Sequence, residues 1–493
     1  MSAPRSPEAL YHAIPQALAD ENSQVVPSDI ELEADVGADY GDLALTTADP
    51  PPVVVDAQIR WIHFVLGCSV LLPWNVMITA TPFFLSRLAG SPLKSTFSSY
   101  LSTSFTASNF LFLAHATVVS KRRSPSRQIR VCITWLSVLT LLLVISTFFR
   151  IAPGLFVAFV LLNGAAQAAL GAYLQTSTIA VASLFGPQAV QAMMSGQAAV
   201  AVAVSGVQVL SSSLFVWRAT PEEITANAVD GSAEQGSARV FFALSTVFLI
   251  ISAVANNILV SKPTYKTLVA PLEQKKFGER GTVEEQQLLT SLGRSDYAND
   301  KARILRVAKA NIIFEIAACY VFIVTLAVFP PITTSVKPTN PSTHHLLFNV
   351  IHFLVFNVGD FSGRYLCAIP SLLIWSAKWL LTLSLARTLF IPVFLMCNIQ
   401  RPTSEFPISP IISSDVLFML ILFAFGLSNG YVSSLCMMSA PSLEHNPRLR
   451  GRKEDVDVAA TVASFSIVGG LAIGSVASFA VRGAICGCNP FTA

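Results

Sequence analysis

The chain has 493 residues, of which 53% are hydrophobic and 12% are charged, whereas a soluble domain has about 25% charged residues. This composition, with a mean hydropathy of +0.59, excludes an ordinary soluble enzyme, a disordered chain and a disulfide-stapled secreted module. The net charge of +3 is the sum of two opposite parts: residues 1–59 hold eleven acids and one base, a net of −10, and residues 60–493 hold the remaining +13.

Residues 1–58 are expected to form a disordered acidic cytosolic tail, because Pro, Ala, Ser and acidic residues dominate them. They lack the basic start and apolar run of a signal peptide. The segment Tyr40-Gly41-Asp42-Leu43 fits a tyrosine-based sorting pattern, but such short patterns are frequent by chance. The compartment therefore stays open between the plasma membrane and a vacuolar or lysosomal membrane.

Eleven apolar runs follow the tail, and a helix needs about 20 such residues to cross a bilayer. We predict an all-α integral membrane protein with eleven transmembrane helices, with the lipid bilayer as its surroundings. The runs are 59–87, 97–120, 129–149, 152–183, 188–217, 239–261, 305–329, 345–370, 378–398, 411–440 and 457–482.

The longest hydrophilic stretch, 262–304, separates six of these helices from five. This division predicts an N-terminal six-helix bundle over 59–261 and a C-terminal five-helix bundle over 305–482, in a 6+5 two-bundle, major-facilitator-like arrangement. A short non-cytosolic tail over 483–493 is expected to follow. Transporters commonly bind their substrate between two such halves near the bilayer midplane.

Lys and Arg residues predict the orientation, because they concentrate in cytosolic loops. The loops after the second, sixth and tenth runs are rich in these residues, and the loops between them are poor. This alternation predicts a cytosolic N-terminus and, after eleven spans, an extracellular or lumenal C-terminus.

Polar residues interrupt several of the apolar runs. In the first run, Pro73 permits a kink and Trp74 offers a flat aromatic face for stacking on a planar ring. In the fourth run, Gly171 and Gln175 share one helix face, and the amide of Gln175 can both donate and accept hydrogen bonds. In the fifth run, Gly196 permits close helix approach.

The eighth run carries the strongest polar signal. Asp360 and Arg364 are four residues apart, so they lie on one helix face and can pair, and Asn357 lies on the same face. An ionisable side chain within a membrane is energetically costly, so we expect it to have a structural or functional role. The pair either locks helix packing or binds a polyhydroxylated, uncharged ligand, and we favour the second interpretation.

Further polar residues lie in neighbouring runs. Glu315, in the seventh run, is expected either to snorkel towards the cytosolic side or to titrate. Arg387 is alone in the ninth run and is expected to bond to carbonyls or to a neighbouring helix. Ser428 and Asn429 interrupt the tenth run, where they bend the helix or line a path.

No P-loop, HExxH, GxSxG or paired-carboxylate motif is present, so we predict neither an enzyme nor an ATP-driven pump. The eight cysteines are scattered, and only Cys486 and Cys488 are close together, a weak metal signal. We predict no metal, no cofactor, no nucleic acid and no obligate protein partner. The eleventh run has Gly470 and Gly474 at a spacing typical of helix packing.

In this order, these patches resemble the signature motifs of the equilibrative nucleoside transporter family. The motifs are LLPWN at 71–75 with TAT at 79–81, GAYLQTS at 171–177, MMSGQ at 193–197, N-x-x-D-x-x-G-R at 357–364, LAR-x-x-F-x-P at 385–392, and FGLSNGY at 425–431 followed by SLCMM at 434–438. The resemblance covers roughly 59–482, and the long acidic tail looks closer to fungal and intracellular members.

The resemblance implies facilitated, alternating-access transport of purine and pyrimidine nucleosides, with nucleobases as additional candidates. It implies a substrate site around Trp74, Gln175, Asp360, Arg364 and Asn357. Asp360 and Arg364 are then expected to hold the ribose hydroxyls, Gln175 to read the base edge, and Trp74 to cover the ring or close a gate. The residues expected to gate or pack near the site are Asn75, Ile78, Gly171, Gly196, Arg387, Ser428 and Asn429.

Three questions stay open. Ile78 stands where the family has a methionine, which leaves inhibitor sensitivity undetermined. Proton coupling through Asp360 or Glu315 is an alternative to pure facilitation. Two alternative functions also stay open. The first is a major-facilitator-like carrier of another small polar solute such as a sugar. The second is a non-transporting receptor, which would bind its ligand without moving it across the membrane.

Overall fold

The computed structural model describes residues 56–94, 97–119, 124–218, 232–271, 273, 285–329, 331–340, 345–399 and 410–486. The predicted acidic tail up to residue 55, with its Tyr40 motif, lies outside the described residues, as do Cys488 and most of the predicted 483–493 tail.

Eleven long helical segments make up the described part of the chain, and two of them consist of shorter helices in succession. The first six are α1 (Ala57–Thr79) with α2 (Thr81–Arg87), α3 (Phe97–Val119), α4 (Pro125–Ser146), α5 (Pro153–Phe185), α6 (Pro187–Arg218) and α8 (Ser232–Ser261). The last five are α11 (Glu285–Val328), α12 (His345–Leu366), α13 (Ala377–Ala386) continuing through η5 (Arg387–Leu389) into α14 (Phe390–Leu395), α15 (Asp415–Ser439) and α16 (Val456–Cys486). A short helix, α9 (Pro263–Leu268), follows α8.

Local sequence explains where several helices begin. Proline is the first residue of α4, α5 and α6, a position where its missing N–H is not needed. Ser124 caps α4, because its side chain accepts a hydrogen bond from the Arg127 backbone N–H. Gly186, with a φ of 99°, turns the chain sharply between α5 and α6.

Nine of the long segments are apolar enough to cross a membrane by composition, whereas α3 and α12 are not. Both helices are long enough to cross a bilayer, because the 23 residues of α3 and the 22 residues of α12 span about 33–35 Å at 1.5 Å per residue. Their polar residues lower their hydropathy, and α12 carries Asn357, Asp360 and Arg364. Helix α12 packs between α6 and α15, so its polar side chains face protein. Several polar side chains of α3, among them Ser102 and Thr103, are exposed instead.

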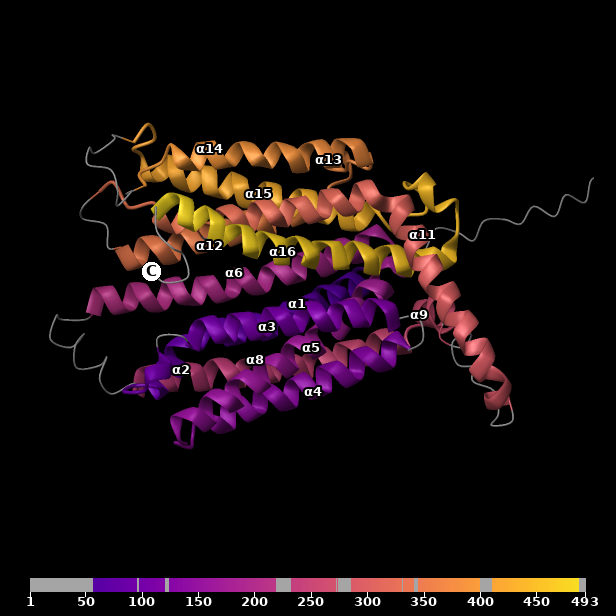
Figure 1. Cartoon of the computed structure of the whole chain (residues 1–493), viewed down its shortest axis with the longest axis horizontal. Helices are drawn as coiled ribbons and strands as arrows, with labels where there is room; N and C mark the ends of the chain where they lie inside the picture. The colour runs from indigo at the N-terminus through magenta and orange to yellow at the C-terminus, as the bar shows by residue number, and fades with distance from the viewer. Residues whose placement is uncertain are drawn as a thin grey trace, which may run out of the picture. The chain divides into compact units, whose positions relative to one another are not determined.

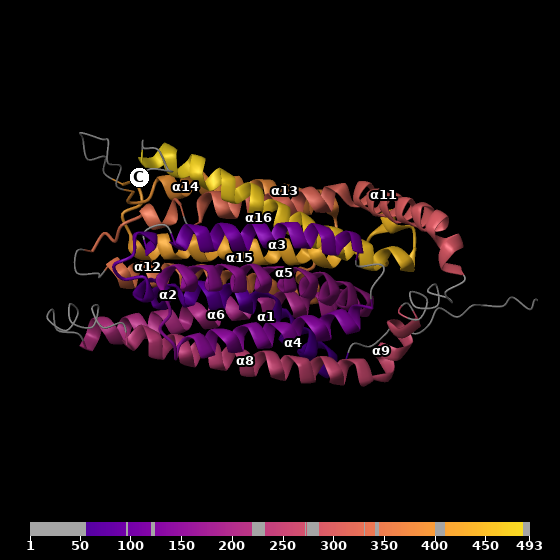
Figure 2. The same ribbon diagram turned by 60° about the horizontal axis from the view of Figure 1, so that its bottom comes forward.

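The long helices run side by side along one axis, and the last five form a group beside the first six (Figures 1 and 2). Helix α6 lies between α1 of the first group and α12 of the second (Figure 1). One end of the helix array carries α9 and the start of α11, with Lys266, Arg303, Arg306 and Arg448. We call it the basic end.

The apolar core differs between the two ends. The main cluster of buried residues joins both helix groups, for example through Met194 of α6 and Ile467 of α16. A second cluster lies away from the basic end and contains residues of the last five segments and of the connections between them, including Val328, Phe356 and Phe425. The two groups are therefore joined by a shared core mainly towards the basic end.

Four glycines bring α12 and α15 into backbone contact. A Cβ atom added at Gly359 or Gly363 would lie 2.5 or 2.1 Å from a carbonyl oxygen of α15. A Cβ added at Gly426 or Gly430 would lie 2.3 or 1.9 Å from a carbonyl oxygen of α12. No other residue type fits these positions without moving a helix.

Glycines also join α11 to α16, as the spacing of Gly470 and Gly474 predicts. A Cβ at Gly470 would lie 2.2 Å from the Cys319 carbonyl oxygen, and at Gly474 2.8 Å from that of Phe322. At the basic end, Asp455 accepts hydrogen bonds from Arg303 at 2.7 Å and Arg306 at 2.9 Å, which ties the same two helices.

We expect Gly470→Ala to lower the melting temperature of the detergent-solubilised protein, because overpacking a tight contact costs about 1–3 kcal/mol. Gly469→Ala is the matched control on the same helix, since no atom lies within 4 Å of its added Cβ. Thermal unfolding followed by tryptophan fluorescence measures both. Equal melting temperatures for the two variants would contradict the close contact between α11 and α16.

Candidate functional site

A small pocket lies between the two helix groups, with about 300 Å³ of space not occupied by atoms. Both groups contribute to its wall. The lining residues are Gln175 and Ile179 of α5, Met193, Met194 and Gln197 of α6, Phe322 of α11, Arg364 of α12, Met437 of α15, and Ser464 and Ile467 of α16. The pocket combines four polar side chains with a mostly apolar wall, as ligand sites commonly do.

The polar side chains of the first group are uncharged. The Gln175 amide nitrogen donates to the Ser464 Oγ at 2.8 Å, a bond that crosses from α5 to α16. Gln197 is buried, and no hydrogen bond is found for its amide within the described residues. An amide offers two donors and one acceptor, so Gln197 can bind a ligand here without first breaking a protein bond.

Arg364 is the one charged residue of the pocket wall, and it also joins the two groups. Its Nε donates to Asp360 Oδ2 at 2.9 Å, as the i, i+4 spacing predicts. Its Nη1 donates to the Met194 carbonyl oxygen at 3.2 Å. Its own carbonyl accepts from the Gln191 amide at 3.1 Å. Arg364 therefore contacts α6 through both its side chain and its backbone.

Asp360 uses both oxygens inside the protein and is not among the pocket-lining residues. Besides Arg364, it accepts from the Asn429 amide nitrogen of α15 at 2.6 Å. Asn429 in turn accepts from the Thr325 hydroxyl at 2.7 Å. In this state, Asp360 orients Arg364, and Arg364 faces the pocket.

Arg387 completes this network at η5, where the helix changes from α13 to α14. The whole residue is only 1% exposed. It donates to the Phe425 carbonyl at 3.1 Å, to the Thr325 Oγ1 at 2.7 Å and to the Ser428 Oγ, and it lies 4.6 Å from the centre of the Phe425 ring. The expected bonds to carbonyls and to a neighbouring helix are confirmed. The buried network holds two guanidinium groups and one carboxylate, a formal charge of +1.

The structure places the predicted residues of α1 beside the pocket wall rather than in it. Trp74 packs against Phe105 of α3, with ring centres 4.8 Å apart, and is not among the lining residues. Asn75 donates to the Leu71 carbonyl of its own helix at 2.9 Å. Ile78 is 42% exposed.

The two predicted glycines differ in how tightly they pack. A Cβ at Gly196 of α6 would lie 2.0 Å from the Phe64 carbonyl oxygen, so this glycine permits the contact with α1. A Cβ at Gly171 would lie 3.9 Å from the Val70 carbonyl oxygen, an ordinary contact. Gly196 is therefore required for packing, and Gly171 is not required by this state.

Two further polar residues from the sequence analysis lie outside the pocket lining. Asn357 of α12 donates to the Ser205 hydroxyl of α6 at 3.0 Å, so it links the two groups away from the basic end. Glu315 does not snorkel: it is 5% exposed and accepts from the Ser466 hydroxyl at 2.7 Å. The snorkelling alternative was wrong because Glu315 faces α16 rather than the surface.

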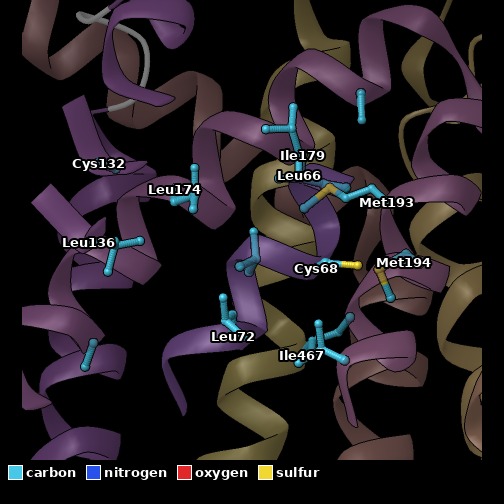
Figure 3. Close-up of a cluster of buried hydrophobic side chains, with 14 of the residues drawn as sticks. Leu66, Cys68, Leu72, Cys132, Leu136, Leu174, Ile179, Met193, Met194 and Ile467 are labelled. Carbon is cyan, nitrogen blue, oxygen red and sulfur yellow. The ribbon is translucent and has the colours of Figure 1, made fainter. Parts of the chain in front are cut away.

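The pocket is closed towards the basic end. Nearly every side chain is buried in the parts of α5, α6, α15 and α16 nearest that end, whereas intermediate and exposed residues alternate with buried ones farther away. Figure 3 shows Leu66, Met193, Met194 and Ile467, from both groups, within this packed region. The helix groups are thus sealed on one side of the pocket.

Sequence reasoning missed Gln191, Gln197, Met194 and Ser464. Gln197 lies next to Gly196 in a motif already recognised, so its position offered a signal. Gln191 and Ser464 follow no polar pattern, and the Met194 contact uses a backbone carbonyl, which a sequence does not reveal.

We expect Arg387→Lys to lower the melting temperature markedly, although the charge is kept. A lysine lacks the planar fork of donors that reaches Thr325, Ser428 and a carbonyl together, and each unmet buried group costs about 1–3 kcal/mol. Lys378→Gln, at an exposed position of the preceding helix, is the control. A stability equal to that of the control would show that the Arg387 network is not required for folding.

Comparison with known proteins agrees with this architecture. Equilibrative nucleoside transporter 1 of Homo sapiens is 27% identical over 470 residues, covering 85% of this chain and 96% of the relative, and that of Rattus norvegicus is 27% identical with the same coverage. The E. coli fucose:proton symporter FucP, 15% identical with a TM-score of 0.52, covers 87% of this chain and 94% of its own. This second similarity shows the fold alone and confirms the major-facilitator-like arrangement.

The family comparison covers most of the membrane part. Residues 158–483 match the family described as Nucleoside transporter, so the match begins within α5, ends within α16 and includes the six long segments between them. The match spans every pocket-lining residue described above. This chain belongs to the nucleoside transporter family.

Proposed function

We propose that this chain carries purine and pyrimidine nucleosides across its membrane by facilitated, alternating-access transport, with nucleobases as additional substrates. The observation that supports this best is the pocket between the two helix groups, which combines one guanidinium, two amides and one hydroxyl with an apolar wall. A nucleoside has the matching chemistry: an uncharged planar base with donors and acceptors on its edge, and a sugar with hydroxyls. We also propose that the chain is a fungal or intracellular-type member, because of its long acidic tail.

Arg364 is the proposed contact for the ribose. Its Nε is held by Asp360 and its Nη1 by the Met194 carbonyl, so the guanidinium keeps a fixed plane at the pocket wall. A guanidinium carries five N–H donors, and these suit hydroxyl oxygens. Asp360 can accept hydrogen bonds from the ribose hydroxyls only after its bond to Asn429 loosens. Its first role is therefore to position Arg364.

The two amides are the proposed contacts for the base edge. Gln175 can exchange its bond to Ser464 for a bond to the base, and Gln197 has no such bond to break. Three methionines, Met193, Met194 and Met437, line the same wall. Flexible thioether side chains adapt to ligands of different size, which supports binding of both purines and pyrimidines. Trp74 is proposed to act as a gate rather than as a stacking partner in this state.

The proposed orientation places the basic end in the cytosol, because Lys and Arg favour the cytosolic side. Because the pocket is sealed at that end, this orientation implies a state that is closed to the cytosol. Release into the cytosol then requires α5 and α6 to separate from α12 and α16, which breaks the bonds of Gln175 to Ser464 and of Arg364 to Met194.

We expect Asp360→Asn and Arg364→Gln each to reduce uridine and adenosine uptake by about tenfold or more, because a lost charge-assisted hydrogen bond is worth about 1.5–3 kcal/mol. Uptake of radiolabelled nucleoside into proteoliposomes measures this at equal reconstituted protein. The control is Glu444→Gln, an exposed acid at the basic end. Uptake like the wild type by both well-folded variants would refute the site assignment.

A second expectation tests alternating access directly. Phe110 of α3 and Phe465 of α16 stack across the two groups with ring centres 5.7 Å apart, and Phe348 and Phe418 stack at the same 5.7 Å within the last five segments. Replacing each pair by cysteines permits bridging with a short, reducible thiol crosslinker.

Bridging the Phe110→Cys/Phe465→Cys pair is expected to stop uptake until reductant is added, because the two helix groups can no longer separate. The Phe348→Cys/Phe418→Cys pair should transport normally when bridged, since both residues belong to one group. Full uptake with the first pair bridged would show that this interface does not open during transport.

A further inference from the structure

Glu315 of α11 is a buried acid that the proposed transport site does not use. Its side chain is 5% exposed. One carboxyl oxygen accepts from the Ser466 hydroxyl of α16 at 2.7 Å, and the other, Oε1, is buried without a hydrogen-bond partner. No Lys, Arg or His lies within salt-bridge distance of it among the described residues.

The neighbouring elements supply no cation that neutralises this acid. Arg448 of η6 (Pro447–Leu449) lies over the ring of Phe314, the residue next to Glu315 in the chain, and it donates to the Ala310 carbonyl. The other titratable groups described on α11 itself are Asp300, Lys301, Arg303, Arg306, Lys309, Cys319 and Tyr320. Those on the elements that pack against α11 are Tyr100 and His115 of α3, Lys378 and Arg387 of α13 and η5, Asp415, Tyr431 and Cys436 of α15, Asp455 just before α16, and Asp457 of α16. His115 is bonded to Tyr173, and Asp455 binds Arg303 and Arg306.

An ionised carboxylate in such surroundings is costly, whereas the neutral acid needs fewer donors. The packing seen here therefore favours the protonated form of Glu315. Any rearrangement that brings water to this carboxyl group would allow the proton to leave.

The location of Glu315 connects it to the closure of the basic end. Glu315 and Phe322 are seven residues apart on one face of α11, and Phe322 lines the pocket. Along the axis of α11, Glu315 thus lies about 10 Å from Phe322, towards the basic end. Its partner Ser466 lies between Ser464 and Ile467, which line the pocket and meet the first helix group. In the proposed opening, this stretch of α16 moves away from α5, which removes one layer of protein that separates the Glu315–Ser466 pair from water.

We infer that Glu315 is a proton-binding site that couples closure of the basic end to the pH of the compartment that this end faces. With its proton, Glu315 stabilises the closed state described here. Without it, the buried charge favours the open state. This inference rests on the proposed function only for its effect on transport, because the effect on closure can be measured separately.

The closure is measured by labelling. Position 467 is buried in the closed state and position 78 is exposed. A cysteine is placed at each position (Ile467→Cys and Ile78→Cys), and the labelling rate at 467 is divided by the rate at 78. This ratio reports opening, because the intrinsic pH dependence of the thiol reaction cancels. A thiol reagent is added to the reconstituted full-length protein between pH 5.5 and 8.5, and peptide mass spectrometry reads each position. The ratio is expected to rise several-fold with pH, and to stay flat when Glu315→Gln is present.

Transport is measured in the same vesicles as exchange of labelled for unlabelled uridine, with equal pH on both sides. The wild-type rate should change with pH, the Glu315→Gln rate should not, and the control Glu444→Gln should follow the wild type. A flat labelling ratio in the wild type, or an unchanged pH dependence in Glu315→Gln, would overturn the inference. Absence of exchange at every pH, with pH-dependent labelling intact, would instead refute the proposed function and leave the proton site standing.

Discussion

The contact between α12 and α15 is the constraint on which the rest of the site depends. Gly359 and Gly363 face Gly426 and Gly430, and each helix brings carbonyl oxygens to where a side chain would otherwise begin. Only this approach lets the Asn429 amide reach Asp360 at 2.6 Å. A carboxylate inside a membrane must have its charge met by protein groups, because neither water nor lipid can do so. The glycines therefore make the buried acid tolerable.

Once Asp360 is fixed, the remaining geometry follows. Arg364 is held in one plane at the pocket wall, and its outer nitrogen reaches the Met194 carbonyl of α6. Arg387 supports the other side of the network through Thr325 and Ser428. The helix break at η5 is what brings this guanidinium inward. Deep burial of both guanidinium groups thus results from one close helix pair and one interrupted helix.

Some of these features can be predicted from the sequence, and others cannot. The apolar runs of the sequence coincide with the eleven long helical segments, although only nine of these segments are apolar enough to cross a membrane by composition. The i, i+4 spacing predicts the bond between Asp360 and Arg364. The partners from other helices, such as Asn429, Gln191 and Ser464, depend on how helices pack, which spacing along one helix does not encode. Trp74 illustrates the limit: its depth in α1 is predictable, but its packing on Phe105 rather than in the pocket is not.

The distribution of charge between the two helix groups has a mechanical consequence. In the pocket and its supporting network, every formal charge belongs to the last five segments, whereas the first six contribute amides and a backbone carbonyl. Charge-assisted hydrogen bonds are worth about 1.5–3 kcal/mol and neutral ones about 0.5–1.5 kcal/mol. The carboxylate bonds thus stay within one group, and the bonds between groups are neutral except for Arg364 to Met194. This arrangement suits the proposed alternating-access cycle, because strong bonds across the interface would hold the two groups in one state.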